Sequence, residues 1–223
     1  MTLGIFGKIP AHGDFIDRQC PRSFLDVWDE WLQRAVSSSQ EILADSWLDI
    51  YLTSPIWRFA SSPGVIDQSA WAGILVPSVD SVGRYFPLTI ASTLESNSNL
   101  FEFMANNDDW FTSLEESALG ALQSQFQADQ LMESLKASTQ VQRQISQTPA
   151  TPPLINQARV AFGNGDIANS YPQLLHSCFA SLSSYSLWAC KGSANMPAAT
   201  LASPSLPEPT QYAAMLEGNW QRP

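Results

Sequence analysis

The chain has few of the residues that build metal sites and covalent catalytic centres. Its 223 residues include two histidines, His12 and His176, and three cysteines, Cys20, Cys178 and Cys190. The histidines have no metal-ligand companion at short spacing, and the cysteines form no CxxC pair. No Gly-x-Ser-x-Gly elbow presents a serine nucleophile. We therefore expect no metal, no cofactor and no covalent catalysis, and the cysteine usage favours a reducing cytoplasm.

Basic residues and long apolar runs are also scarce. Eleven Lys and Arg against twenty-one Asp and Glu give a net charge of −10, which repels nucleic acid and anionic membranes. No run approaches the roughly 18 apolar residues that span a bilayer, and no N-terminal signal segment is visible. These absences predict a cytosolic protein without membrane insertion or a nucleic-acid partner, for which a basic protein partner would fit better.

Aromatic residues are plentiful, with eight Trp and eleven Phe, and they mark an amphipathic helix near the N-terminus. Apolar side chains recur at helical spacing from Phe24 to Ala35, with charged residues between them. Ser23 is in place to cap the helix, with Asp26 three residues later, and the serine run at 37–39 ends the pattern. We expect its apolar stripe to pack on a sheet.

Residues 54–94 show short apolar runs separated by turns: PIWRFA, WAGILVPSVD and YFPLTIAS. These runs predict three strands, joined by connections short enough for antiparallel hairpins. Pro77 and Pro87 belong at strand ends or a bulge, because proline cannot donate to a ladder.

The rest of the chain predicts helices over about 100–147, a proline-rich linker at about 148–153, and then further helices and strands. These are a helix at 174–181, the strand SLWAC, a strand at 199–202 and a helix at 210–216. The fold class is therefore α/β (α+β), with a mixed, largely antiparallel sheet covered by helices and a mid-chain helical insertion. We expect residues 1–223 to form a single domain.

The most informative stretch is GKIPAHGDF, residues 7–15, which follows a short apolar strand. Strand, Gly-Lys and helix is the order of a phosphate-binding loop. That motif also needs a glycine five residues before the Gly-Lys pair and a Ser or Thr after it, where this chain has Thr2 and Ile9. The stretch is therefore no nucleotide site. GNGD at 163–166 likewise lacks the ligand series of a calcium loop and predicts a turn.

Four charged residues, Asp14, Arg58, Asp80 and Arg84, lie beside predicted strands and are flanked by large apolar groups. They could converge at one end of the sheet. Charges near an apolar core need partners, so we favour a buried Asp–Arg network that fixes the loops. A recognition surface is the alternative.

Several ordered stretches together resemble one family, and they are GKIPAHGDF, PRSFLDVWDEWL, WLDIYLTSPIWRFA, WAGILVPSVDSVGRYFPL and SLWACKGS. The chain resembles the TagF/ImpM proteins associated with bacterial type VI secretion. The resemblance implies a cytosolic regulator that represses the apparatus after translation, by binding rather than by catalysis. It also implies a forkhead-associated-domain scaffold protein of the same system as partner. Cys190 and Lys191 depart from the family pattern, in which an acid is often found, and no role is transferred there.

The residues that match the family motifs are expected to form a joint surface. They are Gly7, Lys8, Pro10, Gly13, Asp14 and Phe15 from the first loop, and Trp57, Arg58, Asp80, Gly83, Arg84 and Tyr85 from the strand motifs. Two functions remain open. The first is an interaction protein that binds a secretion component, and the alternative is an enzyme or small-ligand sensor with Asp14, Arg58 and Arg84 in a pocket.

Overall fold

The structure, a computed structural model, describes residues 3–124, 126–140, 154–155, 158–159, 161 and 167–221. Within this part, the main sheet has seven strands: β1 (Leu3–Gly7), β2 (Ile16–Arg18), β3 (Trp57–Ser61), β4 (Ala70–Val76), β5 (Leu88–Leu94), β8 (Ser186–Cys190) and β9 (Ala199–Ser203). Their order is β2-β1-β5-β4-β3-β8-β9, and every neighbouring pair is antiparallel. A separate hairpin pairs β6 (Leu154–Ile155) with β7 (Ala158–Arg159).

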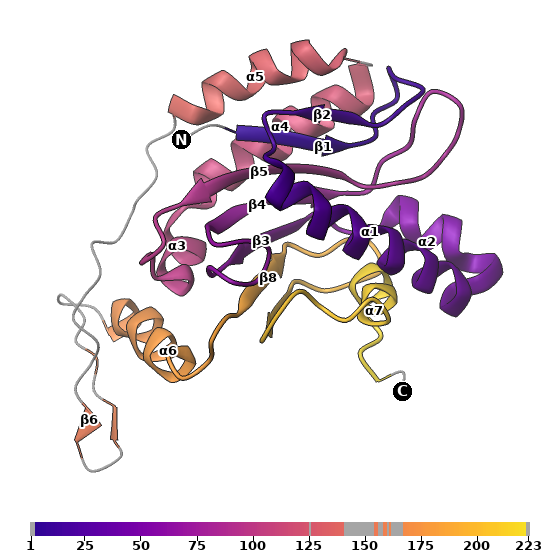
Figure 1. The fold of residues 1–223 in the computed structure, drawn as a ribbon. Coiled ribbons are helices and arrows are strands. Elements are labelled where there is room, and N and C mark those ends of the chain that lie inside the picture. The colour runs from indigo at the N-terminus through magenta and orange to yellow at the C-terminus, as the bar shows by residue number, and fades with distance from the viewer. Residues whose placement is uncertain are drawn as a thin grey trace.

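Helices cover both faces of this sheet (Figure 1). The described helices are α1 (Arg22–Leu43), α2 (Trp47–Thr53), α3 (Leu100–Asn106), α4 (Asp108–Ser124), α5 (Ala128–Gln140), α6 (Tyr171–Phe179) and α7 (Gln211–Glu217), with short 3-10 turns at Ala44–Ser46 and Ile167–Ser170. One core lies under α1, α2 and α7 and contains Trp28, Trp31 and Trp188. The other lies under α3, α4 and α5 and contains Trp110 and Phe111. The fold is thus mixed α/β, as the sequence predicts.

The central strands form where their sequences predict them. β3, β4 and β5 are consecutive antiparallel neighbours, and their residues are almost all buried because helices cover both faces. Pro77 directly follows β4 and Pro87 directly precedes β5, so neither proline interrupts a ladder. On its other side, β3 pairs with β8, which comes much later in the chain.

Helix α1 is longer than the sequence predicts. The apolar residues from Phe24 to Ala35 that indicate it are all buried, but the serine run at 37–39 does not end it. Ser39 is buried, where its hydroxyl donates to Val36 O and accepts from Trp47 Nε1, each at 2.8 Å. A serine with both roles filled is tolerated inside a helix, so α1 continues to Leu43.

The start of α1 also differs from the prediction. Pro21 is at the N-cap position, and no side chain caps the helix there. Ser23 instead lies within the first turn and donates to Asp67 Oδ2 at 2.7 Å. The predicted capping box of Ser23 and Asp26 is therefore wrong, because the serine bonds the connection between β3 and β4.

The mid-chain insertion consists of α3, α4 and α5 as far as the structure describes it. The predicted linker at 148–153 and the predicted turn at 163–166 lie outside the described residues. The predicted later elements appear as α6, β8, β9 and α7, whereas α2 and β2 were not predicted. None of the helices in the described part combines the length and apolarity that a membrane span requires.

Candidate functional site

Two loops meet at one end of the sheet: residues 8–15, which follow β1, and residues 77–87, which join β4 to β5. Together they are called the two-loop end. Gly7 opens the first loop with a φ of +128°, and a Cβ there would lie 2.0 Å from Pro87 O. Only glycine accommodates both the backbone angle and this contact. The close approach fixes where the first loop leaves the sheet.

Hydrogen bonds between the two loops hold them together. Ser78 Oγ donates to Lys8 O at 2.6 Å, and Ser81 N donates to His12 O at 2.9 Å. Helix α2 adds a further tie, since Tyr51 Oη donates to Ser78 O and accepts from Ser78 N, both at 3.0 Å. The second loop is thereby fixed both to the first loop and to α2.

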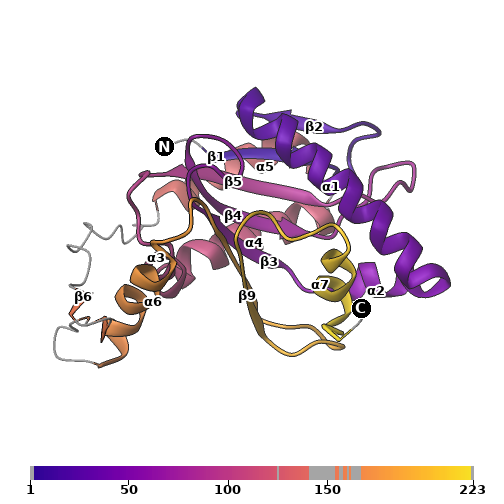
Figure 2. The same cartoon turned by 60° about the horizontal axis from the view of Figure 1, so that its bottom comes forward.

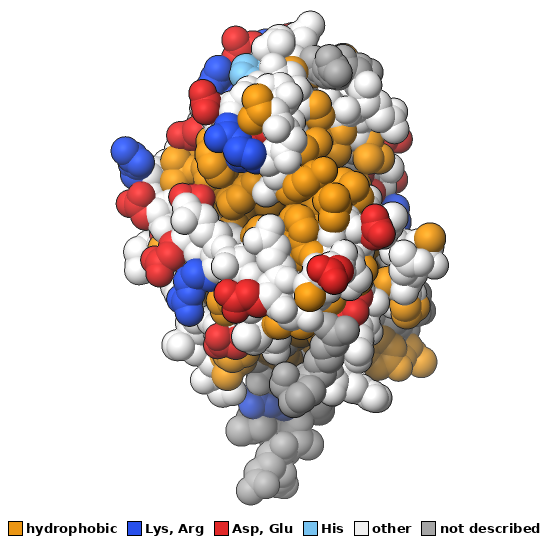
Figure 3. Space-filling view, turned by 90° about the vertical axis from the view of Figure 1, so that its right-hand side faces the viewer, with side chains coloured by type: hydrophobic (Ala, Val, Ile, Leu, Met, Phe, Trp, Pro, Cys, Tyr) orange, Lys and Arg blue, Asp and Glu red, His pale blue; other side chains and the backbone are white. Residues whose placement is uncertain are grey.

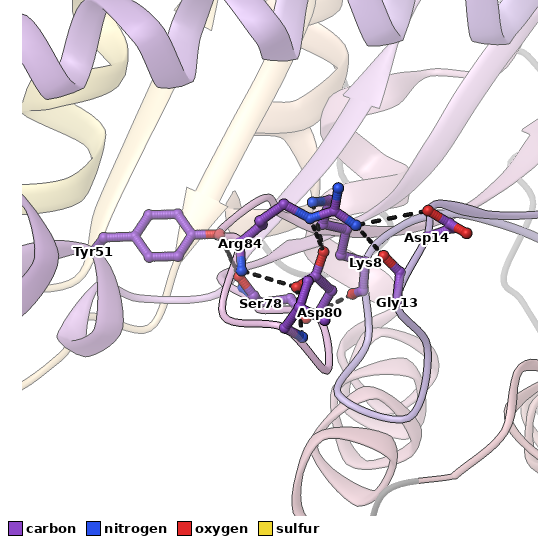
Figure 4. Close-up of polar contacts among 8 residues, drawn as sticks. Lys8, Gly13, Asp14, Tyr51, Ser78, Asp80 and Arg84 are labelled. Carbon is purple, nitrogen blue, oxygen red and sulfur yellow. Dashed lines mark hydrogen bonds and ion pairs between the residues drawn. The ribbon is translucent and has the colours of Figure 1, made fainter.

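Asp80 lies at the centre of this arrangement, and its side chain is 0% exposed. The carboxylate accepts from Lys8 Nζ at 2.8 Å, from Arg84 Nε at 2.7 Å, and from the backbone N–H groups of Val82 and Arg84 at 3.0 and 2.8 Å (Figure 4). Burial alone would raise its pKa, but the bonds from Lys8 and the other donors outweigh burial and hold the pKa well below 3.8. Asp80 is thus an ionised anchor for both loops.

Arg84 connects this buried anchor to the surface. Its side chain is 56% exposed, although Nε bonds Asp80 and an Nη atom donates to Gly13 O. The same Nη atom lies 3.7 Å from Asp14 Oδ1, and the Asp14 side chain is fully exposed. Figure 4 shows the guanidinium between the buried and the exposed carboxylate. Solvent or a partner can therefore reach part of the guanidinium and all of Asp14.

Apolar side chains surround these charges at the surface. Val82 is 68% exposed at the tip of the second loop, and Phe15 is 49% exposed at the end of the first. The Phe15 ring packs edge-on against Phe86 at 4.8 Å and stacks on Phe6 at 5.9 Å, so it is held in place. Figure 3 faces this end and shows hydrophobic side chains gathered in a patch bordered by charged ones. Such patches mark interaction sites.

Arg58 belongs to a different cluster. Its Nε and Nη1 atoms contact Glu115 and Asp108 of α4, each at 2.5 Å, and its guanidinium lies 5.1 Å from the Phe111 ring centroid. Bonding to Arg58 lowers the pKa of Asp108, with a smaller contribution from Lys191. This cluster joins β3 to α4 and does not reach Asp80 or Arg84.

Comparison with known proteins identifies the family. The model of the TagF N-terminal domain, type VI secretion system-associated, matches residues 4–138, which include both loops, Asp80, Arg84 and the Arg58 cluster. The chain belongs to this family. It also matches the crystal structure of PA0076 from Pseudomonas aeruginosa PAO1, solved at 2.05 Å resolution, with 31% identity and a TM-score of 0.79. That match covers 100% of this chain and 97% of the other. A search of the curated proteins found no match.

The structure corrects the predicted locations of two charged residues in this TagF domain, Arg58 and Asp14. Asp14, Asp80 and Arg84 converge at one sheet end, but the prediction that Arg58 joins them is wrong. Consecutive strand residues point to opposite faces, so Arg58 faces α4 while Trp57 faces α7, where its Nε1 donates to Met215 O. The favoured interpretation of Asp14 as a buried network member is also wrong, because its side chain is fully exposed.

Only some of the residues that match the family motifs are exposed. Lys8, Trp57, Arg58 and Asp80 are buried, so they support the fold of the TagF domain instead of meeting a partner. Tyr85 is half-buried and packs edge-on against Trp47 and Tyr51. Asp14, Phe15, Gly83 and Arg84 are exposed, and they remain the accessible part of the predicted set.

Sequence reasoning missed two contributors to the two-loop end. Val82 is its most exposed apolar side chain, and the signal was an isolated apolar residue between Ser81 and Gly83 in a turn. Tyr51 was part of a motif that carried the family resemblance, but nothing in the pattern indicated its bonds to Ser78. Within the described residues, no group of three or more His, Cys, Asp or Glu side chains is placed to hold a metal.

Proposed function

We propose that this type VI secretion-associated TagF domain is a cytosolic regulator that lowers secretion after translation by binding a component of the apparatus. The forkhead-associated-domain scaffold protein is the partner we propose, and no catalysis is involved. One observation carries the proposal. Three exposed groups lie together at the surface: Val82 and Arg84 are held by a buried, ionised Asp80, and Phe15 is held by Phe6 and Phe86.

The chemistry of these groups suits protein binding. Arginine and aromatic side chains, phenylalanine included, are enriched at protein–protein interfaces. Two hydrogen bonds from Arg84 to the Asp80 carboxylate hold Arg84 in position before a partner arrives. This reduces the conformational entropy that Arg84 loses on binding. Arg84 also offers an accessible guanidinium to a carboxylate or a carbonyl of the partner.

The alternative of an enzyme or small-ligand sensor required Asp14, Arg58 and Arg84 to share one pocket. Arg58 instead bonds α4, and Asp14 is fully exposed. No observation favours this alternative, so binding through the two-loop end is the function we propose.

The role in secretion is tested by deleting and overproducing the protein in its own bacterium. We expect deletion to raise type VI secretion and overproduction to lower it, while the amounts of the apparatus proteins stay constant. Secreted and cellular apparatus proteins are measured by immunoblot in a strain whose apparatus is active. Equal secretion in all three strains would refute the repressor assignment.

The binding surface is tested with Val82→Asp, which places a charge in the exposed apolar patch without touching the core. The matched control is Leu119→Asp, because Leu119 is also exposed, at 41%, but belongs to α4. We expect Val82→Asp to melt like the wild type yet to bind the purified scaffold protein roughly tenfold more weakly or worse. It should also relieve repression, whereas Leu119→Asp should do neither. Wild-type binding by Val82→Asp would refute the assigned surface.

A further inference from the structure

Among the described strands, β9, the last of the sheet, has a neighbour on one side only. Figure 2 shows where β9 lies in the fold. This strand pairs with β8 at the end of the strand order, and no described residue hydrogen-bonds its outer edge. Its sequence ATLAS contains no charge and no proline, although Pro197 and Pro204 lie just outside it. Charges and prolines are the usual means of blocking an edge strand against pairing. The edge of β9 is therefore open to a further strand.

The register identifies which backbone groups face outward. Ser62 N donates to Tyr185 O, which extends the β3–β8 ladder by one pair. In an antiparallel sheet, the backbone groups of successive residues face opposite neighbouring strands. Residues 185, 187 and 189 therefore bond β3, and residues 186, 188 and 190 bond β9. The β9 partners of the latter are residues 199, 201 and 203. Thr200 and Ala202 therefore direct their N–H and C=O groups away from the sheet, and both residues are exposed.

An apolar hollow lies beside the same two residues. It has a volume of about 480 Å³ and lies between α3, α6 and the β8–β9 part of the sheet. Its lining includes Phe101, Met104, Leu175 and Leu187 together with Thr200 and Ala202. None of the described residues that line the hollow is charged. The open edge and the hollow thus form one continuous site.

We propose that β9 accepts an extended segment of a partner protein as an additional strand, with large apolar side chains at alternate positions entering the hollow. The outward N–H and C=O groups of Thr200 and Ala202 would pair with the backbone of that segment. Because neither β9 nor the hollow carries charge, the paired residues of the segment are uncharged. The net charge of −10 favours basic residues on either side of them.

A second copy of the chain fits this site less well. A symmetric β9–β9 pair would bring only Thr200 and Ala202 to the hollow, and these small side chains would leave most of it unfilled. Two chains of charge −10 also repel each other. The site is separate from the two-loop end, so this proposal stands or falls independently of the proposed function.

The test uses a phage-displayed library of random heptapeptides selected against the full-length protein. Ala202→Pro removes one outward N–H without touching the β8 ladder, and Ala202→Ser is a control that keeps it. Ala105→Trp fills the hollow from α3 and tests the site without altering the strand, should Ala202→Pro fail to fold. Circular dichroism melts establish which variants are folded.

We expect the enriched peptides to carry large apolar residues at alternate positions. They should bind the wild type and Ala202→Ser equally, and bind Ala202→Pro and Ala105→Trp roughly tenfold more weakly or worse. Equal binding of the peptides to a folded Ala202→Pro or Ala105→Trp would overturn the proposal. A selection that enriches no peptide on the wild type relative to the folded variant would overturn it as well. Dimerisation of the wild type that Ala202→Pro abolishes would overturn the assigned occupant in favour of a second copy.

Discussion

Replacing Asp80 by asparagine removes the negative charge that Lys8 and Arg84 share. The Lys8 side chain is 6% exposed, and among the described residues Asp80 is the carboxylate within ion-pair distance of it. Removing one partner of a buried pair leaves an uncompensated charge and costs about 3–5 kcal/mol. Arg84 is half-exposed and remains solvated, so it adds little. For a chain of this size the loss corresponds to a fall in Tm of about 6–20 °C.

Urea denaturation at pH 7 measures this loss, with Lys8→Met and the double variant completing a cycle. Lys8→Met should cost less, because Asp80 keeps its bonds to Arg84 and two backbone N–H groups. The double variant should cost less than the sum, with a coupling of at least about 0.5 kcal/mol. Asp129→Asn is the control, since its pair with Arg18 is exposed and should contribute less than about 1 kcal/mol.

The same reasoning fixes a pH dependence. Folding lowers the pKa of Asp80 below 3.8, so its ionised form stabilises the fold fully above that value and progressively less as the pH falls. The difference in unfolding free energy between wild type and Asp80→Asn should therefore shrink by about 1 kcal/mol between pH 5 and pH 3. A difference below about 1 kcal/mol at pH 7, or one that does not change with acidification, would refute the assigned role of Asp80.

Four further substitutions test the remaining features. Asp14→Ala should leave the thermal melt unchanged because the side chain is fully exposed, and a clear drop in Tm would contradict this. Arg58→Met should cost about 1.5–3 kcal/mol in urea denaturation, since it removes the charged donor of Glu115, whose side chain is only 15% exposed; a near-neutral result would mean that solvent replaces that bond. Gly7→Ala should lower Tm far more than Gly83→Ala, which has a positive φ but open space around the new Cβ and should cost about 1–2 kcal/mol. Equal losses would argue against the close approach at Gly7.

The sheet was predictable because its signals are local. Short apolar runs with turn residues between them predicted β3, β4 and β5 and their antiparallel pairing, and Pro77 and Pro87 marked the ends correctly. The ion pair between Asp80 and Arg84 follows from their spacing across one tight turn. Helix α1 overran its predicted end because the bonds of Ser39 depend on a tryptophan that lies on the next helix.

The candidate site was harder to predict because it depends on the direction of side chains. The sequence suggests that Arg58 and Asp80 meet at one end of the sheet, because both lie beside predicted strands. In the structure, the alternation of side chains along β3 directs Arg58 toward α4. Asp14 belongs to a loop, where no periodicity indicates which way a side chain points, and its exposure became clear only in the structure. The edge of β9 became recognisable only once the strand order was known.

The pairing of β3 with β8 also has a consequence for folding during synthesis. Tyr185 N donates to Ser62 Oγ across 123 residues of sequence, so one edge of β3 has no partner until those residues have been made. At about 5–20 residues per second, translation leaves this edge bare for roughly 6–25 s. Throughout that interval the nascent chain has an unpaired strand edge beside aromatic and apolar side chains, a combination that favours aggregation.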